Sequence, residues 1–408
     1  MKVAIDVRVT PGEAGGVAPA VRSLISALSS LEDGPEVYTV VVGSQKQADW
    51  LSPSGSRHRF VFRPQSSRHP LLRPLWPLVR RIQNYLTLPG HWPEVPLSDG
   101  FFEGLGCDVI HFPTQSYTVC ALPSVYNPID LQHLHYPQFF DARTISWRES
   151  VYRTGCNLAQ ALIVNSDWIK NDVVRNYRVD PEKIHVIAEA SPTTSPAALN
   201  RTSLDEVRAK YTLKDTFILY PAVAWPHKNH LRLFEALAYL RDERGLRLPL
   251  VCTGSRFPPF WPQVEAALTR LQLASQVRFL GHVPDADLRA LYQLATAVVL
   301  PSLFEANSLP VFEAWLVGTP VACSNTTGLP EQVGDAALLF NPLDCVQIAD
   351  ALAAVVRDRE ARASLRQRGF CRLGEFSWER TARAYRALYR KVGGRLLGEE
   401  DKALLGAL

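Results

Sequence analysis

Several signals that define whole protein classes are missing from this chain of 408 residues. Its seven cysteines are scattered and include no C-x-x-C pair, which argues against a zinc or redox motif and suits a reducing cytosol. No apolar run approaches the ~18 residues needed to span a bilayer. The opening Met1-Lys2-Val3-Ala4-Ile5 runs straight into a strand and leaves no room for an export signal. We therefore expect a cytoplasmic protein.

The chain also lacks a large excess of charge of one sign. Its formal net charge is only +4, which indicates no nucleic-acid partner. Acidic residues are absent between Trp50 and Pro93. That stretch instead interleaves leucines and Trp76 with seven arginines: Arg57, Arg59, Arg63, Arg68, Arg73, Arg80 and Arg81. A basic, partly apolar segment favours an anionic membrane surface, here the inner face of the cell membrane. The alternative is a loop and helix that pack on their own domain.

Short apolar segments alternate with helical stretches along the chain, which is typical of parallel sheets with crossover helices. Strands are expected at Lys2–Val9, Val37–Val42, Cys107–Phe112, Ser124–Asn127, Leu162–Val164, Ile184–Ile187, Phe217–Pro221, Leu248–Cys252, Val277–Leu280, Ala297–Leu300 and Pro320–Cys323. The length suits two domains. We expect a first domain at 1–190, a Ser/Thr/Pro-rich linker at 191–202, a second domain at 203–375 and a final helix at 376–395.

In doubly wound sheets, ligands bind beyond the carboxyl ends of the strands, so the residues after each strand are the candidates for a site. Glu305 and Glu313 follow the strand ending at Leu300 and flank the start of a helix, with Pro310 in its first turn. Amides at such a helix start suit a diphosphate, and each carboxylate can accept hydrogen bonds from vicinal sugar hydroxyls. The alternative is a capping acid and a solvated helix acid.

Lys228 follows an earlier strand of the same half, in Trp225-Pro226-His227-Lys228-Asn229. A lysine there can neutralise a leaving diphosphate, although most lone lysines are solvated surface charges. Asp285-Ala286-Asp287 resembles a metal-binding pair of aspartates but is better explained as a helix start, because no other hard oxygen ligands cluster nearby. We therefore expect no metal site.

The first half offers two further candidate segments. Gly15 and Gly16 follow the first strand and let the backbone approach a ligand, although they do not form G-x-G-x-x-G and a plain flexible loop is the alternative. Asp130 and His133 follow the strand near Ser124, where either could orient or deprotonate an acceptor hydroxyl. The alternative for His133 is a core histidine with its hydrogen bonds satisfied.

These residues and their surroundings resemble glycosyltransferase family 4, over nearly the whole chain. Glu305 to Glu313 matches the family's E-x7-E element. The other matching segments are Leu300-Pro301-Ser302, Gly318-Thr319-Pro320-Val321, Pro330 to Ala337, Pro226-His227-Lys228-Asn229, Val164-Asn165-Ser166, Val179 to Ile184 and Phe376-Ser377-Trp378. The resemblance implies the GT-B architecture, in which two Rossmann-like, doubly wound α/β domains face a central cleft.

The resemblance also implies an activity and roles for residues. It implies a retaining, metal-independent hexosyltransferase, such as a mannosyltransferase, that uses a UDP- or GDP-linked sugar and no cofactor. The acceptor would be a saccharide or lipid-linked hydroxyl in lipopolysaccharide or exopolysaccharide assembly. Lys228 would contact the donor diphosphate, Glu313 the ribose and Glu305 the transferred sugar. Other residues expected at the site are His227, Asn307, Ser308, Leu309, Gly254 and His282 on the donor side and Gly15 and Gly16 on the acceptor side.

Three positions depart from the family pattern. Ala306-Asn307-Ser308 stands where Gly-Phe-Gly is frequent, His227 is the nearest basic neighbour of the lysine in place of an arginine, and Ile129 replaces a histidine before Asp130. Two alternatives therefore stay open, a sugar-nucleotide epimerase of the same fold and a non-catalytic nucleotide-sugar binder. A phosphorylase that uses pyridoxal phosphate is disfavoured, because it would need a second buried lysine.

Overall fold

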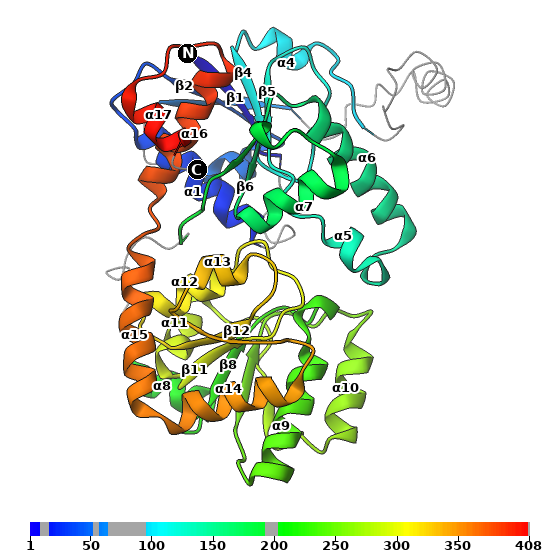
Figure 1. Cartoon of the computed structure of the whole chain (residues 1–408), viewed down its shortest axis with the longest axis vertical. Helices are drawn as coiled ribbons and strands as arrows, with labels where there is room; N and C mark the ends of the chain where they lie inside the picture. The colour runs from blue at the N-terminus through cyan, green and yellow to red at the C-terminus, as the bar shows by residue number, and fades with distance from the viewer. Residues whose placement is uncertain (9–15, 52–56, 64–94, 192–202, 407–408) are drawn as a thin grey trace. The chain divides into compact units, whose positions relative to one another are not determined.

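The computed structural model describes residues 1–8, 16–51, 57–63, 95–191 and 203–406. The chain divides into two compact units, whose segments Figure 1 colours by residue number. Unit 1 comprises Met1–Pro192 and Ser377–Leu408, and unit 2 comprises Thr193–Phe376. The C-terminal segment therefore belongs to the unit in which the chain begins.

Unit 1 contains a seven-stranded parallel sheet in the order β3-β2-β1-β4-β5-β6-β7. Its strands are β1 (Lys2–Asp6), β2 (Val37–Val42), β3 (His58–Phe62), β4 (Val109–Phe112), β5 (Ser124–Tyr126), β6 (Ala161–Val164) and β7 (Ile184–Val186). Every residue of β4, β5 and β6 is buried, as expected for a parallel sheet with helices on both faces. The strand order reverses between β1 and β4, whose carboxyl ends form the topological switch point.

The helices of unit 1 present apolar faces to this sheet. In α1, the predicted stripe of Val21, Leu24, Ile25 and Leu28 is buried. The elements are α1 (Val17–Ser30), α2 (Gln45–Leu51), α4 (Phe101–Gly104), α5 (Gln132–His135), the 3-10 helix η2 (Pro137–Phe139), α6 (Ala142–Leu158), α7 (Asp167–Tyr177), η3 (Pro181–Lys183), α16 (Trp378–Val392) and α17 (Glu399–Gly406).

Unit 2 contains a six-stranded parallel sheet in the order β10-β9-β8-β11-β12-β13. Its strands are β8 (Ile218–Pro221), β9 (Leu250–Thr253), β10 (Val277–Phe279), β11 (Ala297–Leu300), β12 (Val321–Ser324) and β13 (Leu338–Phe340). The order reverses between β8 and β11, so their carboxyl ends form the switch point of this sheet. The edge strands β3 and β13 were not expected from the sequence.

The helices of unit 2 enclose one apolar core with the sheet. They are α8 (Leu204–Lys210), η5 (Pro226–Lys228), α9 (His230–Arg244), α10 (Trp261–Arg270), α11 (Asp285–Leu294), α12 (Leu309–Leu316), α13 (Leu329–Val333), α14 (Cys345–Arg357) and α15 (Arg359–Leu373). Asp285 begins α11, which confirms the expected helix start. Asp287 accepts hydrogen bonds from Lys210 Nζ and Tyr211 Oη, both at 2.6 Å.

The final helix α16 packs on unit 1 through buried aromatic side chains. Ser377 caps the helix by accepting a hydrogen bond from the amide of Arg380. Trp378 Nε1 donates to the carbonyl of Ser191 at 2.7 Å, and Tyr389 Oη lies 2.8 Å from His111 Nδ1 on β4. These contacts explain why a helix so far along the chain belongs to the first sheet.

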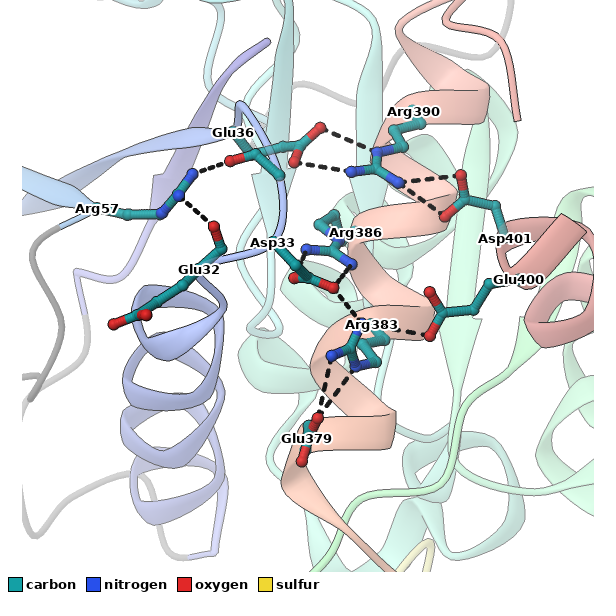
Figure 2. A network of polar contacts seen from close by, with 11 residues as sticks. Glu32, Asp33, Glu36, Arg57, Glu379, Arg383, Arg386, Arg390, Glu400 and Asp401 are labelled. Carbon is teal, nitrogen blue, oxygen red and sulfur yellow. Dashed lines mark hydrogen bonds and ion pairs between the residues drawn. The ribbon is translucent and has the colours of Figure 1, made fainter. Parts of the chain in front are cut away.

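A second set of contacts on α16 is ionic. Figure 2 shows three arginines, spaced by three and four residues along one side of the helix, that we call the arginine ladder: Arg383, Arg386 and Arg390. Arg383 and Arg386 both reach Asp33 in the turn after α1. Arg390 binds Glu36 just before β2 and Asp401 of α17. The ladder therefore joins α16 to the α1–β2 turn and to α17.

Three buried histidines make the stability of both units sensitive to acid. Burial lowers the pKa of His111 and His185 to about 4 and that of His230 to about 3, from a usual value near 6.5. At a pH between the folded and unfolded pKa values, these histidines are protonated in the unfolded chain and neutral in the folded chain. The contribution of these neutral histidines to the free energy of unfolding is therefore complete above about pH 6.5 and is lost as the pH drops toward 4.

His230 allows a direct test of this pH dependence. It is fully buried against Tyr220, Phe234 and Phe279, and neither ring nitrogen has a hydrogen-bond partner among the described residues. We expect His230→Phe to keep the wild-type unfolding free energy at pH 7 or exceed it. Between pH 6.5 and 5 its unfolding free energy should fall by about 1–2 kcal/mol less than that of the wild type. Urea unfolding at several pH values measures this, and parallel curves for the two proteins would contradict it.

Candidate active site

The loops after β8 and β11 meet at the switch point of unit 2. They are joined by a backbone hydrogen bond of 2.8 Å from the amide of Leu303 to the carbonyl of His227. Asn229, which follows η5 and precedes α9, donates to the carbonyl of Pro301 at 2.9 Å. Because β8 and β11 are adjacent, residues about 80 positions apart in sequence become neighbours. Polar groups from both loops therefore share one edge of the sheet.

Lys228 and Glu305 are the charged pair at this edge. Lys228 Nζ lies 2.5 Å from Glu305 Oε1, and their side chains are 18% and 10% exposed. The backbone places the lysine, because Lys228 ends the 3-10 helix η5 and its amide donates to the carbonyl of Trp225 at 3.0 Å. A cation and a carboxylate so poorly hydrated attract each other more strongly than a surface pair. The sequence analysis expected both residues in one site, and the structure brings them into contact.

The helix that follows Glu305 has the predicted start. Ser308 lies just before α12, and Pro310 is in the first turn. The Ser308 amide, however, donates to Gln332 Oε1 at 2.9 Å. Of the three amides expected to face a diphosphate, this one has a partner inside the chain. Asn307 and Leu309 lie on either side of it.

Glu313 lies inside α12, about one turn from the start of the helix, and is partly exposed. Burial raises the pKa of its carboxyl group, and a hydrogen bond from Tyr292 Oη of α11 at 2.5 Å opposes part of that rise. Tyr292 is in turn fixed by its carbonyl, which accepts from Thr319 Oγ1 at 2.6 Å. Glu313 is thus a carboxylate held in one orientation, with Tyr292 rather than Lys228 as its hydrogen-bond partner.

Three other donor-side candidates lie after strands of the same sheet. Gly254 follows β9 with φ +96°, and a Cβ atom there would lie 2.7 Å from the carbonyl oxygen of Ala222, so the backbone requires glycine. His227 lies in η5 with its ring 5.6 Å from that of Trp225. His282 is exposed after β10. Gly254 therefore has a local structural reason that is independent of a ligand.

On the acceptor side, Gly16 is exposed and directly precedes α1 after β1, at the switch point of unit 1. Gly15 lies outside the described residues. Asp130 accepts from the amide of Gln132 at 3.0 Å and lies 3.8 Å from Arg148 Nη1. It therefore helps to fold the turn into α5, which follows Ile129 with a positive φ of 68°.

His133 lies in the core of unit 1. It is 1% exposed, its Nε2 lies 2.8 Å from Glu149 Oε1, and Tyr177 Oη donates to the same carboxylate at 2.7 Å. The side chain joins α5 to α6 and α7. This placement is that of a core histidine, although within the described residues its Nδ1 has no hydrogen-bond partner, and a buried ring is not open to an acceptor hydroxyl.

Two residues at the site carried no signal in the sequence. Tyr292 fits the apolar stripe of an amphipathic helix, and only the structure shows its hydroxyl on Glu313. Gln332 lies 24 residues after the amide that it binds. The sequence placed Gln332 only within the segment Pro330 to Ala337, which matches the family, and assigned it no role of its own. Within the described residues, no group of three or more His, Cys, Asp or Glu side chains is placed to hold a metal ion.

Comparison with known proteins shows the family of the chain. A family model described as Glycosyltransferase Family 4 matches residues 14–190, and one described as Glycosyl transferases group 1 matches residues 204–371. O-antigen chain mannosyltransferase B of Escherichia coli is 30% identical over 260 residues, which cover 62% of this chain and 67% of that protein. The chain belongs to glycosyltransferase family 4. As the resemblance implied, it is a glycosyltransferase.

A second relative of this family 4 glycosyltransferase is much longer than the region that it shares. The serotype-specific mannosyltransferase WbdA of Escherichia coli is 33% identical over 301 residues, which cover 71% of this chain and 36% of WbdA. The chain therefore spans about a third of that relative.

Solved structures share the fold at lower identity. Sucrose-phosphate synthase from Thermosynechococcus elongatus has a TM-score of 0.68 and 19% identity, covering 97% of this chain and 99% of that one. HepE from Anabaena, in complex with UDP and glucose, has a TM-score of 0.68 and 18% identity, covering 96% and 100%. With two doubly wound parallel sheets in the chain, these likenesses confirm the GT-B fold class.

Proposed function

We propose that this glycosyltransferase moves a hexosyl group, most simply mannose, from a UDP- or GDP-linked donor to an acceptor hydroxyl with retention of anomeric configuration. The Lys228–Glu305 pair at the switch point of unit 2 carries the proposal. Two relatives named as mannosyltransferases support the sugar, and the one named as an O-antigen chain mannosyltransferase supports an acceptor in surface-polysaccharide assembly. Complexes of HepE with UDP-glucose support a nucleotide-sugar ligand for this fold.

In the proposed complex the diphosphate lies near Lys228 and the start of α12. As the bond to the anomeric carbon breaks, negative charge grows on the leaving phosphate, and a fixed ammonium group stabilises it without having to reorient. Lys228 meets this requirement because its partner Glu305 and the turn of η5 fix its position. Glu305 accepts hydrogen bonds from the hydroxyls of the transferred sugar. We propose that neither a metal ion nor a cofactor is required.

Glu313 is proposed to bind the ribose hydroxyls of the donor. A carboxylate held by Tyr292 can accept two hydrogen bonds from vicinal hydroxyls, each contributing about 1.5–3 kcal/mol. We expect Glu313→Leu to lower kcat/KM for the ribonucleotide donor by about 100-fold or more. The loss should be much smaller with the matching 2′-deoxy donor, which already lacks one of the hydroxyls. Equal losses with both donors would contradict the assignment.

A panel of UDP- and GDP-linked sugars tests the function as a whole, with and without saccharide and lipid-linked acceptors. We expect transfer that depends on the acceptor, and a product whose glycosidic bond has the donor's anomeric configuration by NMR. Conversion of the donor sugar without acceptor would show an epimerase instead. Tight donor binding without turnover would show a non-catalytic binder.

Membrane contact through Arg57–Arg81 belongs to the same proposal. In the structure the three described arginines of this stretch contact unit 1: Arg57 donates to the carbonyls of Glu32 and Gly34, Arg59 to Thr39 and Arg63 to Asp99. Residues 64–81 lie outside the described residues. None of the described helices is long and apolar enough to cross a membrane. Flotation with anionic vesicles at low and high salt tests surface binding, and absence of binding at low salt would overturn it.

A further inference from the structure

The loop that carries Glu305 is held by the segment between β12 and the end of α13. Thr327 Oγ1 accepts from the amide of Glu305 at 2.9 Å and lies 2.7 Å from its carbonyl oxygen. The amide of Gly328 donates to the same carbonyl at 3.0 Å. Both polar groups of the Glu305 backbone are therefore bound by this one segment, residues 327–332, which we call the bracing segment.

The same segment holds the other end of the loop. Gln332 Oε1 accepts from the amide of Ser308, and its Nε2 donates to the carbonyl of Ser308, both at 2.9 Å. Gln332 is 7% exposed, so water competes little for these bonds. Its own backbone is fixed by Arg372 Nε, which donates to the Gln332 carbonyl at 3.1 Å. The Gln332 side chain thus binds both the amide and the carbonyl of Ser308, as a residue of a neighbouring β-strand would.

The fit between loop and bracing segment is close. A Cβ atom at Gly328 would lie 2.4 Å from the carbonyl oxygen of Ala306, so only glycine fits beneath the loop. Thr327 has a φ of +53°, which is unusual for a β-branched residue and persists only where neighbouring contacts hold it. Contacts at Glu305, Ala306 and Ser308 leave this part of the loop little freedom.

We propose that Thr327 and Gln332 are positioning residues that set the Glu305–Ser308 loop before the donor binds. The inference rests on the proposed function, because the loop carries the Glu305 carboxylate assigned to the sugar and leads into the start of α12, near which the diphosphate is proposed to lie. A loop ordered in advance does not lose conformational freedom on binding, and it keeps the reacting groups in place for the transition state. The contacts shown for both residues are with the backbone of the loop, and the proposed role of each is to act through it.

Replacing Gln332 with leucine tests the proposal, because leucine has a similar size and no hydrogen-bonding groups. The matched control is Gln276→Leu. Gln276 is also buried in unit 2 and donates to a backbone carbonyl, that of Leu248, at 2.8 Å, but it precedes β10 at the opposite edge of the sheet. We expect Gln332→Leu to lower kcat/KM for the donor by about 10- to 100-fold, mainly through kcat. Gln276→Leu should change it less than twofold, even where it lowers the melting temperature as much.

Thr327 offers a rescue experiment at the other end of the loop. Thr327→Val removes the hydroxyl and keeps the shape, and Thr327→Ser keeps the hydroxyl. We expect the valine variant to lose about 10-fold or more in kcat and the serine variant to keep most of it. A serine variant as impaired as the valine variant would overturn the role of the hydroxyl.

Hydrogen exchange separates this inference from the proposed function. Without any donor, amides of residues 303–309 should exchange at least about 10-fold faster in Gln332→Leu than in the wild type or in Gln276→Leu. If the wild type transfers no sugar from any donor, the proposed function fails, and this exchange comparison still decides whether the segment braces the loop. Unchanged exchange, or faster exchange with an unchanged kcat/KM, would overturn the inference.

Discussion

Replacing Lys228 with alanine is expected to lower kcat for sugar transfer by about 10²- to 10³-fold. Losing one fixed group that stabilises a developing negative charge has effects of this size. Two consequences of the change act together: the leaving diphosphate loses its cation, and the Glu305 carboxylate, only 10% exposed, loses its partner. Initial rates with saturating donor and acceptor measure the effect. KM for the donor should change less than kcat, because the charge develops in the transition state.

Lys210 provides the control for this experiment. It also pairs with a carboxylate in unit 2, with Lys210 Nζ 2.6 Å from Asp287 Oδ2, but it lies on α8 and its side chain is 55% exposed. Lys210→Ala should keep transfer within twofold of the wild type. Lys228→Ala and Lys210→Ala with equal rates would show that Lys228 is a structural cation, and the assignment of the diphosphate site would then be wrong.

A double-mutant cycle sharpens the result. Because Lys228 and Glu305 are in direct contact, their effects on kcat should not add. We expect Lys228→Ala/Glu305→Ala to be far less impaired than the product of the two single losses. Full additivity would mean that the two side chains serve independent steps.

The sequence predicted through one physical rule that Lys228 and Glu305 lie in one site, and the structure adds that they are paired. Carboxyl ends of parallel strands meet at the same edge of a sheet, and the two strands that end before these residues are neighbours across the switch point. Glu313 was predicted on the following helix for the same reason. The rule does not identify the hydrogen-bond partners of the groups in the site. The hydroxyl of Tyr292 on Glu313 and the amide of Gln332 on Ser308 depend on how α11 and α13 pack.

The strands that escaped prediction share a physical cause. β3 and β13 lie at sheet edges, where one side is unpaired and the burial that gives central strands their continuous apolar runs is incomplete. In β3 no residue is fully buried and Phe62 is exposed; in β13 only Phe340 is buried. The signal for such strands is weak because the sequence needs fewer apolar residues there.

His133 shows the limit of reasoning from loop position. A histidine after a strand can be a base or a core residue, and both alternatives were open. The deciding facts are the carboxylate of Glu149 and the hydroxyl of Tyr177, which come from later helices. No spacing in the sequence links those residues to His133, so burial could be seen only in the structure.

The arginine ladder shows the same limit on a helix. Residues spaced by three and four positions share one face of a helix, and arginines at that spacing are compatible with a solvated face. The acids that bind the ladder lie in α17 and, 350 to 354 residues earlier, in the α1–β2 turn. Because these acids converge on the ladder, arginines that the sequence alone would place in solvent instead join α16 to the α1–β2 turn and to α17.

Arg390→Ala is expected to lower the free energy of unfolding of unit 1 by about 3–5 kcal/mol. Arg390 forms paired hydrogen bonds of 2.9 Å to the carboxylate of Glu36 and of 3.0 Å to that of Asp401. The side chains of Glu36 and Asp401 are only 4% and 6% exposed, so alanine would leave two buried negative charges without a cation. Removing one partner from a buried ion pair has a cost of this size.

Arg395→Ala is the control, because Arg395 is 53% exposed and makes a single ion pair of 3.1 Å with Asp108. Exposed pairs contribute about 0–1 kcal/mol, so urea unfolding of this variant should nearly overlay that of the wild type. High salt should reduce the difference in unfolding free energy between Arg395→Ala and the wild type. The difference between Arg390→Ala and the wild type should hardly change, since screening acts mainly on exposed charges. Equal small losses in the two variants would mean that water reaches Glu36 and Asp401, and that apolar packing of Tyr385 and Tyr389, rather than the arginine ladder, holds α16 on unit 1.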